Sequence, residues 1–317
     1  MNNPMTLPVS IVIPSADTIE AIDELLLTIL RQDTLPSEIL LIQSGNVFIN
    51  RGFFENWSNY YGEINVRFQA IQVSQALPGM ARNVGIRNAR QPWIAFLDIG
   101  VLPKNIWLQE LYKCMTQARA DVVWGSCMFF SGDFLGRILC ASSYGDRRTY
   151  PTLPGSLVKI DVFRKAGFFE ERLRACEDLL WKDALVRHNI KEIYCKSACV
   201  SYSSFPRSIW SAMYKQYIYE QNILISQTFK ATRVVGLLYL ALSLIIIPIF
   251  PKLGFGSATF YIVFRGLIRP VLKSGIWWQS YPQLVVAPFI LVLLDLSSIV
   301  GLMVASLGFS KYRLTET

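Results

Sequence analysis

The sequence predicts an α/β fold with a mostly parallel sheet, followed by a C-terminal helical transmembrane module. Over the first 200 residues, short β-branched runs alternate with stretches of helical periodicity, which is typical of parallel strands connected by helices. The charges divide at the same place: the first 200 residues hold 21 basic and 20 acidic side chains, and the remainder holds 10 basic and only three acidic ones. With 52% hydrophobic and 17% charged residues, the chain is too apolar for an ordinary soluble protein.

The first elements follow from apolar runs and their spacing. Val9–Ile13 is a β-branched run closed by a proline, and Thr18–Arg31 carries apolar residues at helical spacing, so a strand leads into a helix. Short apolar runs predict further strands, and a periodic stretch predicts a helix before the last of them. The strands are expected at 39–42, 66–68 and 93–97, and the helix at 79–89.

The next elements are a helix over 105–119 and a strand over 121–125. The stretch 132–154, rich in Gly, Ser, Arg and Pro, predicts a mobile loop region. Together these elements predict a soluble domain over residues 1–205. Ligands of open parallel sheets bind at the carboxyl ends of the strands, so we expect the chemistry in the residues that directly follow each strand.

The C-terminal part predicts membrane association. Residues 206–232 carry aromatic and basic side chains in the composition of an amphipathic interfacial helix. Residues 233–317 form a transmembrane module of two or three hydrophobic segments: Val234–Pro251 and Leu284–Phe309 are candidate spans, and 253–272, which carries Arg265 and Arg269, is a weak third span or an interfacial helix. Asp295 inside a span is either functional or the partner of one of those arginines.

The charge and cysteine patterns bound the location. Excess positive charge lies beside the apolar segments rather than in a stripe on the first 200 residues, so it indicates anionic lipid headgroups and not nucleic acid. The six cysteines have no paired framework, which favours buried thiols in a reducing compartment; Cys195 and Cys199 could form half of a metal site, but no second pair accompanies them. We therefore expect a multi-pass protein of the inner (plasma) membrane with its soluble domain in the cytoplasm. The sequence does not indicate an oligomeric state.

Three carboxylates are candidates for chemistry. Asp98 directly follows a hydrophobic strand, where a carboxylate is costly unless it faces a ligand or hydrogen-bond donors. Glu177 and Asp178 begin a predicted helix, where they are either partners of the helix dipole or a general base. His188 is the single histidine, and phosphate-loop and dinucleotide fingerprints are absent from the sequence, so histidine catalysis and those nucleotide folds are disfavoured.

The order of the motifs carries more information than any one of them. In chain order they are Val9–Pro14, Ala81–Ile86, Ile94–Asp98, Leu102-Pro103, Trp107-Leu108, the strand from Gly155, Val162–Glu171 and Glu177-Asp178. This arrangement resembles the family 2 inverting nucleotide-sugar glycosyltransferases over about residues 8 to 230. Ser201-Tyr202 and Phe205–Arg207, leading to Gln216-Tyr217 and then to hydrophobic segments, are most similar to the membrane-anchored enzymes of exopolysaccharide assembly.

The resemblance implies a Rossmann-like, glycosyltransferase A-type fold. It also implies transfer of a sugar from a nucleotide-diphosphate-sugar to a lipid-linked or polysaccharide acceptor at the cytoplasmic face of the membrane. Asp98 matches the family's Asp-x-Asp motif, which binds a divalent cation (Mg²⁺ or Mn²⁺), and Asp178, beside Glu177, matches the general base. The residues implied on the donor side are Pro14, Ser15, Gln43, Arg82 and Asp98, and those on the acceptor side are Gly155, Trp181, Arg207 and Gln216.

The chain departs from the family pattern at two places. Gln43-Ser44 stands where the family has an Asp after the second strand, and Asp98-Ile99-Gly100 lacks the second carboxylate of Asp-x-Asp. Because hard cations depend on the number of oxygen ligands, the loss of one weakens metal binding. The alternative hypothesis is therefore a catalytically degenerate membrane subunit or scaffold of a polysaccharide synthesis complex.

Overall fold

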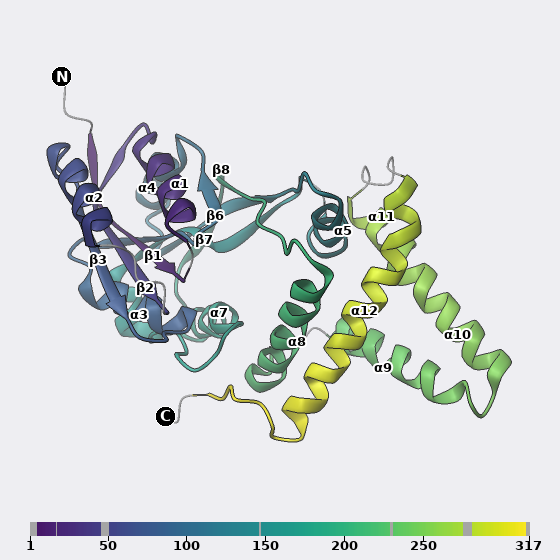
Figure 1. Ribbon diagram of the computed structural model, residues 1–317. Coiled ribbons are helices and arrows are strands. Elements are labelled where there is room, and N and C mark those ends of the chain that lie inside the picture. The colour runs from purple at the N-terminus through teal and green to yellow at the C-terminus, as the bar shows by residue number, and fades with distance from the viewer. Residues whose placement is uncertain are drawn as a thin grey trace.

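One mixed sheet organises the N-terminal part of the computed structural model, which describes residues 5–16, 18–45, 51–145, 147–228, 231–274 and 281–314. Within these residues, eight strands pair in the order β3-β2-β1-β4-β7-β6-β8-β5 (Figure 1). The strands are β1 (Thr6–Ser15), β2 (Leu35–Ser44), β3 (Arg67–Val73), β4 (Trp93–Phe96), β5 (Val101–Pro103), β6 (Val122–Phe129), β7 (Thr149–Lys159) and β8 (Glu192–Tyr202).

The predicted mostly parallel sheet is confined to one half. β3, β2, β1 and β4 are parallel to one another, but β7 runs antiparallel to both β4 and β6, and β5 runs antiparallel to β8. The mixed half was missed because β7 lies largely inside the stretch 132–154 that composition assigned to a loop. Gly155 does not begin that strand but lies within it, at a φ of 100°.

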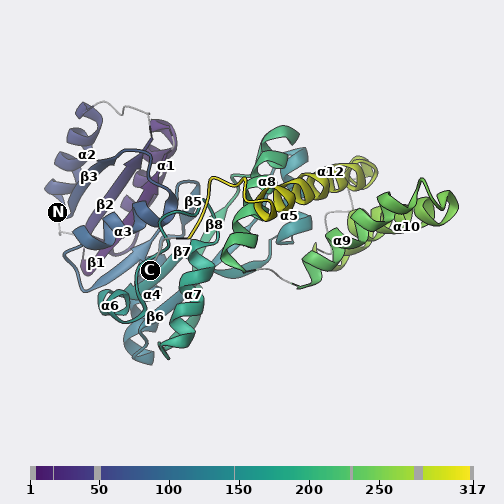
Figure 2. The ribbon, with the colours of Figure 1, turned by 90° about the horizontal axis from the view of Figure 1, so that it is seen from below.

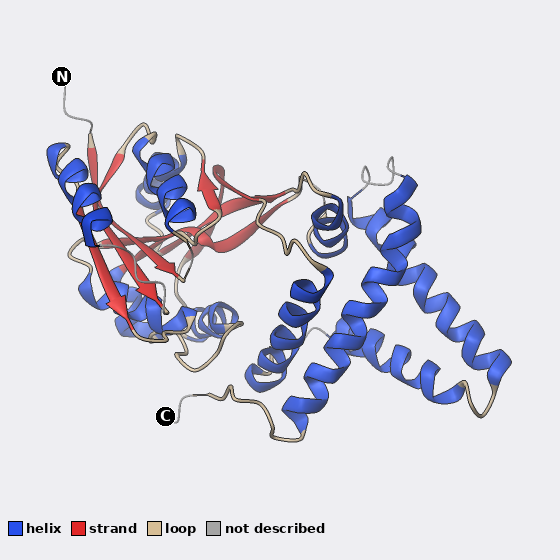
Figure 3. Ribbon diagram, in the orientation of Figure 1, coloured by secondary structure: helices blue, strands red, loops and turns tan. Residues whose placement is uncertain are grey.

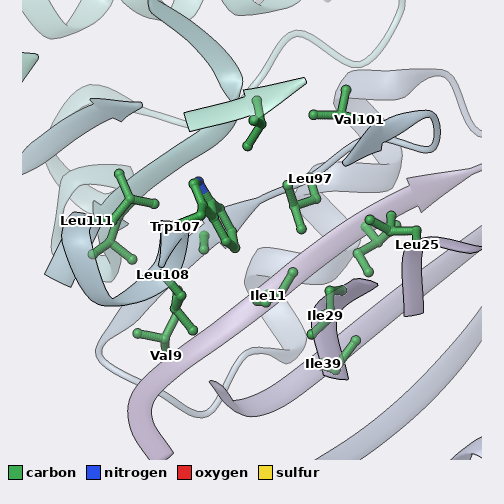
Figure 4. Packing of buried hydrophobic residues seen from close by; sticks show 14 of the residues in the cluster. Val9, Ile11, Leu25, Ile29, Ile39, Leu97, Val101, Trp107, Leu108 and Leu111 are labelled. Atoms are coloured by element: carbon green, nitrogen blue, oxygen red, sulfur yellow. The ribbon is translucent and has the colours of Figure 1, made fainter. Parts of the chain in front are cut away.

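Helices cover both faces of the sheet (Figure 3). α1 (Ile19–Leu30), α2 (Arg51–Glu63) and α4 (Trp107–Ala118) cover one face, and α3 (Pro78–Asn88), α6 (Ile160–Ala166) and α7 (Glu177–Arg187) cover the other. Side chains of a strand alternate, which divides those of β1 between the two faces. Ile11 lies on the side of α1 and α4, where Trp107 is fully buried (Figure 4), and Val12 lies on the α3 side.

A helix replaces the mobile loop that the composition of 132–154 predicted. α5 (Phe134–Ser143) begins at Asp133, whose side chain accepts a hydrogen bond from the Gly136 main-chain N–H at 2.6 Å, as an N-cap residue does. Its apolar side is buried against the C-terminal helices. The Gly and Ser residues of this stretch therefore cap and pack a helix, and the prediction of a loop was wrong.

The C-terminal helices pack around α12. They are α8 (Ile209–Ser226), α9 (Ala231–Ile246), α10 (Pro251–Val263), the π-helical turn η1 (Phe264–Ile268), α11 (Arg269–Ser274) and α12 (Tyr281–Ser306). An apolar cluster joins α5, α8 and α12, which lie side by side in Figure 2. At Gly301 the two long helices approach so closely that a Cβ would lie 2.5 Å from the Tyr217 carbonyl oxygen.

One helix of the described chain, Pro282–Ser306, is long and apolar enough to cross a membrane, with 39% of its most apolar window buried. This agrees with the second predicted span. The first predicted span, Val234–Pro251, instead ends as a helix at Ile246, and α10 begins at Pro251 and folds back beside α9. Hydropathy measures how apolar this segment is but does not detect the proline-containing turn at its end. The structure therefore does not support the multi-pass arrangement.

Buried polar side chains join four of these helices. Asp295 on α12 is fully buried and accepts hydrogen bonds from Arg233 of α9 (2.6 Å), Arg265 of η1 (2.9 Å) and Tyr261 of α10 (2.8 Å). Arg233 also donates to Glu220 of α8 at 3.0 Å. Of the two interpretations of Asp295, pairing with Arg265 is the one that the structure realises.

Two cysteines differ from the expectation of unpaired thiols. Cys114 of α4 and Cys195 of β8 form a disulfide, so Cys195 is not available as half of a metal site with Cys199. The four remaining cysteines are buried thiols, as expected. The pairing joins residues 81 apart in the chain, which sequence spacing alone could not indicate.

Candidate active site

The predicted donor-side residues gather where the parallel strands end. Ser15 of β1 is in register with Gln43 of β2, and Pro14 precedes it. β4 runs beside β1, and the Leu97 main-chain N–H donates to the Val12 carbonyl at 3.2 Å, so Asp98 follows at the same edge. The rule that ligands bind at the carboxyl ends of parallel strands thus brings Pro14, Ser15, Gln43 and Asp98 to one edge.

Arg82 is the centre of the site. Its Nη2 donates to both carboxylate oxygens of Asp98, at 2.9 and 3.0 Å, and its Nη1 donates to Oε1 of Glu177 at 2.5 Å. The residue is only 4% exposed. α3 carries Arg82 close to the sheet because Gly85 lies against Val12, where a Cβ would meet the valine side chain at 2.4 Å. One buried guanidinium therefore holds two carboxylates that lie 79 positions apart in the sequence.

Asn83, the neighbour of Arg82, fixes the segment that leads to α7. Its side-chain amide donates to the Phe169 carbonyl at 2.9 Å, and its oxygen accepts from the Phe169 main-chain N–H at 3.0 Å. Both groups are buried. The Arg-Asn pair thus acts on two successive parts of the site, since Arg82 binds the carboxylates and Asn83 positions the chain before them.

Glu177 and Asp178 begin α7. Burial raises the pKa of the Glu177 carboxyl, and Arg82 offsets part of this rise. Burial also raises the pKa of Asp178, again opposed by Arg82, and the Asp178 Oδ1 accepts the Leu179 main-chain N–H at 2.9 Å. Glu177 is bound directly to Arg82, whereas Asp178 forms no ion pair among the described residues. Of the two, Asp178 is the carboxylate left to accept a proton.

Gln43 is a buried amide whose side chain lacks a hydrogen-bond partner. Its exposed fraction is 0%, and neither its side-chain oxygen nor its side-chain nitrogen has a partner within the residues that the structure describes. A buried amide with no partner costs free energy of about 1–3 kcal/mol per group. Its position at the end of β2, beside Ser15, makes it a ready donor and acceptor for a planar polar ligand such as a base edge.

Gly100 and Ser204 explain the shortened acidic motif. Gly100 has a φ of 83°, and a Cβ there would lie 2.5 Å from the Ser204 Oγ. Ser204 thus occupies the space into which a second carboxylate would project. Both oxygens of Asp98 already accept from Arg82, and the described residues contain no cluster of three or more His, Cys, Asp or Glu side chains. Among the described residues, Asp98 is the one carboxylate of the motif that could contribute to binding a divalent cation, and no step below depends on such an ion.

The four residues predicted on the acceptor side separate in the structure. Trp181 is buried in the core, where its Nε1 donates to the Gly167 carbonyl at 3.0 Å, and Gly155 is buried in β7, where its carbonyl accepts from Trp107 at 3.0 Å. Gln216 donates at 2.9 Å to Glu220, the residue of α8 that also binds Arg233. Arg207 alone is exposed, immediately before α8.

Two tyrosines on which the Asp178 charge acts were not among the predicted site residues. Burial raises the pKa of Tyr144, at the end of α5, and of Tyr219, on α8, and the Asp178 charge contributes to both shifts. Tyr144 also stacks on Phe129 with ring centroids 3.8 Å apart. Alternating strand patterns do not reveal such residues, because both stand on helices assigned to the loop region or the membrane interface.

Comparison with known proteins accounts for this arrangement. The profile described as Glycosyl transferase family 2 matches residues 10–171, just over half of the 317 residues. The chain belongs to glycosyl transferase family 2. The match contains the end of β1, Arg82, Asp98 and the segment held by Asn83, so the family 2 assignment covers most of the site and ends shortly before Glu177.

The proteins similar to this family 2 chain include a named glycosyltransferase and a named mannosyltransferase. "Uncharacterized glycosyltransferase EpsJ" of Bacillus subtilis is 27% identical over 169 residues, which is 53% of this chain and 44% of EpsJ, so the match spans less than half of that relative. The solved structure of S. aureus TarS 1-349 with UDP-GlcNAc has a TM-score of 0.51 at 13% identity, covering 95% of this chain and 92% of TarS 1-349. The mannosyltransferase PcManGT of Pyrobaculum calidifontis, solved with GDP-Man and Mn²⁺, has a TM-score of 0.56 at 12% identity, covering 96% and 88%. These neighbours show the glycosyltransferase A-type fold.

Proposed function

We propose that the protein is an inverting glycosyltransferase that moves a sugar from a nucleotide-diphosphate-sugar to a lipid-linked or glycan acceptor at the cytoplasmic face of the membrane. The observation that carries the proposal is the Arg82 bridge between Asp98 and Glu177, because it joins the strand edge of a donor site to the helix that begins with Asp178. UDP-GlcNAc in TarS and GDP-Man in PcManGT support a nucleotide-sugar donor. EpsJ shares the family but leaves the acceptor open.

The donor side rests on residues at the ends of β1, β2 and β4. The free amide of Gln43 suits hydrogen bonding to a nucleobase edge, with Pro14 and Ser15 beside it. Arg82 positions Asp98 at the end of β4, where the carboxylate is one third exposed and available to donor hydroxyls. In this proposal, Arg82 is a positioning residue because its two amino groups are occupied by carboxylates.

Asp178 is the proposed general base. It takes the proton of the acceptor hydroxyl as that oxygen attacks the anomeric carbon; the bond from this carbon to the diphosphate oxygen breaks, and the nucleoside diphosphate leaves with the electron pair. Attack on the face opposite the leaving group inverts the anomeric centre. A raised pKa suits this role because it makes Asp178 a stronger base than an ordinary aspartate.

The test compares Asp178→Asn with Asp183→Asn, an exposed aspartate on the same helix. The purified protein in detergent is incubated with radiolabelled UDP-, GDP- and TDP-sugars and vesicles of total bacterial lipid, and transfer is measured by extraction into organic solvent. We expect Asp178→Asn to abolish transfer while calorimetry shows unchanged donor binding, and Asp183→Asn to retain transfer. Wild-type turnover by Asp178→Asn would show that the base is misassigned.

A silent subunit is the second candidate function. Gly100 and the Ser204 side chain that fills its vicinity favour it, because the second motif carboxylate is missing. The unpartnered Gln43 amide favours a site that still binds a ligand. Calorimetry against the same nucleotide-sugars separates the two, since a silent scaffold predicts no specific binding to any of them.

A further inference from the structure

Arg174 and Lys215 are two exposed cations on segments that face each other. Arg174 lies in the chain before α7, and Lys215 lies on α8. Neither side chain forms an ion pair with a carboxylate in the part of the chain that the structure describes, although eleven such pairs occur elsewhere in it. Two neighbouring like charges without a counter-charge repel each other, and a bound anion relieves that repulsion.

The contacts of α8 place these two segments together. The Asn222 Oδ1 accepts the Arg174 main-chain N–H at 2.9 Å. Lys215, Tyr219 and Asn222 are spaced four and then three residues apart, so they lie on one face of the helix. That face therefore turns toward Arg174. Partial desolvation of the Lys215 ammonium by the surrounding protein, followed by repulsion from Arg174, lowers the pKa of Lys215.

The same face adjoins the proposed base. Tyr219 lies between Lys215 and Asn222 on α8, and the charges of Asp178 and Glu177 contribute to the raised pKa of its phenol. Asp178 follows Arg174 by four residues, and the residue before Arg174, the buried Leu173, packs with Ile218 of α8. The cation pair thus stands beside the acceptor side of Asp178 and not over the strand ends of the donor side.

Another part of the α8 surface packs on α12, the helix long enough to cross a membrane. Trp210 (75%) and Tyr214 (60%) of α8 are exposed. Aromatic side chains at this exposure are typical of the membrane interface. An anion that reaches Lys215 from this side would be attached to a lipid. Arg offers a planar fork and Lys a point charge, the combination that binds phosphate groups in proteins.

We infer that Arg174 and Lys215 bind the phosphate or diphosphate of a lipid-linked acceptor and so hold its sugar hydroxyl at Asp178. The inference rests on the proposed function and names the class of its acceptor. The phosphate is an anchor only: no bond to phosphorus forms or breaks, and the reacting bonds are those of sugar transfer.

The experiment uses the full chain in detergent and farnesyl diphosphate as the probe, with binding measured by thermophoresis. Farnesol and inorganic diphosphate are the comparison ligands. Arg174→Gln and Lys215→Gln are tested beside Arg187→Gln and Lys113→Gln, which remove exposed cations elsewhere on the surface. We expect each of the first two variants to weaken farnesyl diphosphate binding about tenfold, as loss of one charged hydrogen bond does, and the controls to bind as wild type.

The outcomes are separable. Unchanged binding by both Gln variants overturns the inference, as does equal affinity of wild type for farnesol. Inorganic diphosphate that binds as tightly as farnesyl diphosphate, and with the same sensitivity to the variants, would show a free-phosphate site and overturn the lipid assignment. Circular dichroism checks folding. Calorimetry with nucleotide-sugars on the same variants keeps the two proposals apart. A wild-type protein that binds no nucleotide-sugar would overturn the proposed function and leave the farnesyl diphosphate result unchanged.

Discussion

At the scale of single residues, the site depends on a cation that sequence patterns could not place. Motif order suggested that Arg82 faces the nucleotide, yet two of its guanidinium nitrogens are taken up by Asp98 and Glu177, which lie 16 and 95 positions away. Such contacts arise from the packing of α3 and α7 on one face of the sheet. Periodicity identifies the helices but not which of their polar residues meet.

Replacing Arg82 by methionine should cost stability as well as activity. The change leaves two carboxylates near each other without their cation, and breaking a buried ion pair costs about 3–5 kcal/mol. Arg87→Met is the control, because its partner Glu171 lies 3.3 Å away in a half-exposed pair, which contributes about 1 kcal/mol or less. Urea unfolding followed by circular dichroism measures the difference. Equal losses in the two variants would mean that the Arg82 bridge contributes no more than a surface pair.

The pH dependence of transfer should report the raised pKa of Asp178. The ionised carboxylate is the active form, so the rate falls as the pH drops through that pKa, at a higher pH than the value of about 3.9 for an ordinary aspartate. Because Arg82 favours the ionised form, Arg82→Met should move this acidic limb further upward. Initial rates across acidic to neutral pH measure both shifts. A limb near that of a free aspartate would contradict the assigned environment.

The carboxyl groups of Glu177 and Asp178 link the stability of the folded state to pH. Their pKa values are higher in the folded than in the unfolded chain, so the folded state binds the proton more tightly. Their contribution to stability is therefore greatest at acidic pH and decreases as the pH rises from the ordinary to the raised pKa. This cost of ionisation is what keeps the proposed base reactive.

At the scale of elements, strands and amphipathic helices of the first half were predictable because burial on one or two faces imposes a period. β1, β2, α1 and α3 appear within a few residues of their expected places. α5 was not predicted, although Leu135, Ile138 and Leu139 form its apolar side. The Gly, Ser and Arg content of the stretch outweighed this short periodic signal. Hydropathy likewise found α12 but overlooked the turn between α9 and α10.

Because α8 and α12 approach closely at Gly301, a larger side chain at this position should lower the stability of the protein. Valine at Gly301 would place its Cβ 2.5 Å from the Tyr217 carbonyl oxygen, whereas valine at Gly236 of α9 meets nothing within 4 Å. Both positions are helical, so intrinsic propensity changes equally. We expect Gly301→Val to destabilise the protein by about 1–3 kcal/mol relative to Gly236→Val, as overpacking does. Thermal unfolding in detergent tests this, and indistinguishable midpoints would show that the helices can separate without cost.

At the scale of the whole molecule, the polar cluster around Asp295 connects α8, α9, α10 and α12. Asp295→Leu would leave Arg265 without a carboxylate and Arg233 with Glu220 alone, at a cost of about 3–5 kcal/mol. Ser297→Ala, also on α12, removes one hydrogen bond of 2.7 Å from the Ser297 hydroxyl to the Met213 carbonyl of α8 and should cost about 1 kcal/mol. Limited proteolysis and thermal unfolding compare them. A Leu variant as resistant as the Ala variant would mean that the cluster does not hold the bundle.

The docking of the Glu177–Asp178 segment on α8 bears on how the enzyme can be handled. Leu173 is buried with Ile218 of α8 and Tyr312 near the C-terminus, and Asn222 holds the Arg174 backbone. A soluble fragment ending at residue 205 would keep every strand of the sheet yet lose all three of these supports. In this fragment, nucleotide affinity can be retained while turnover falls. The strand ends of the donor side are intact, whereas the contacts that position Asp178 are removed. Truncation at residue 205 would thus reduce turnover in addition to removing the C-terminal helices.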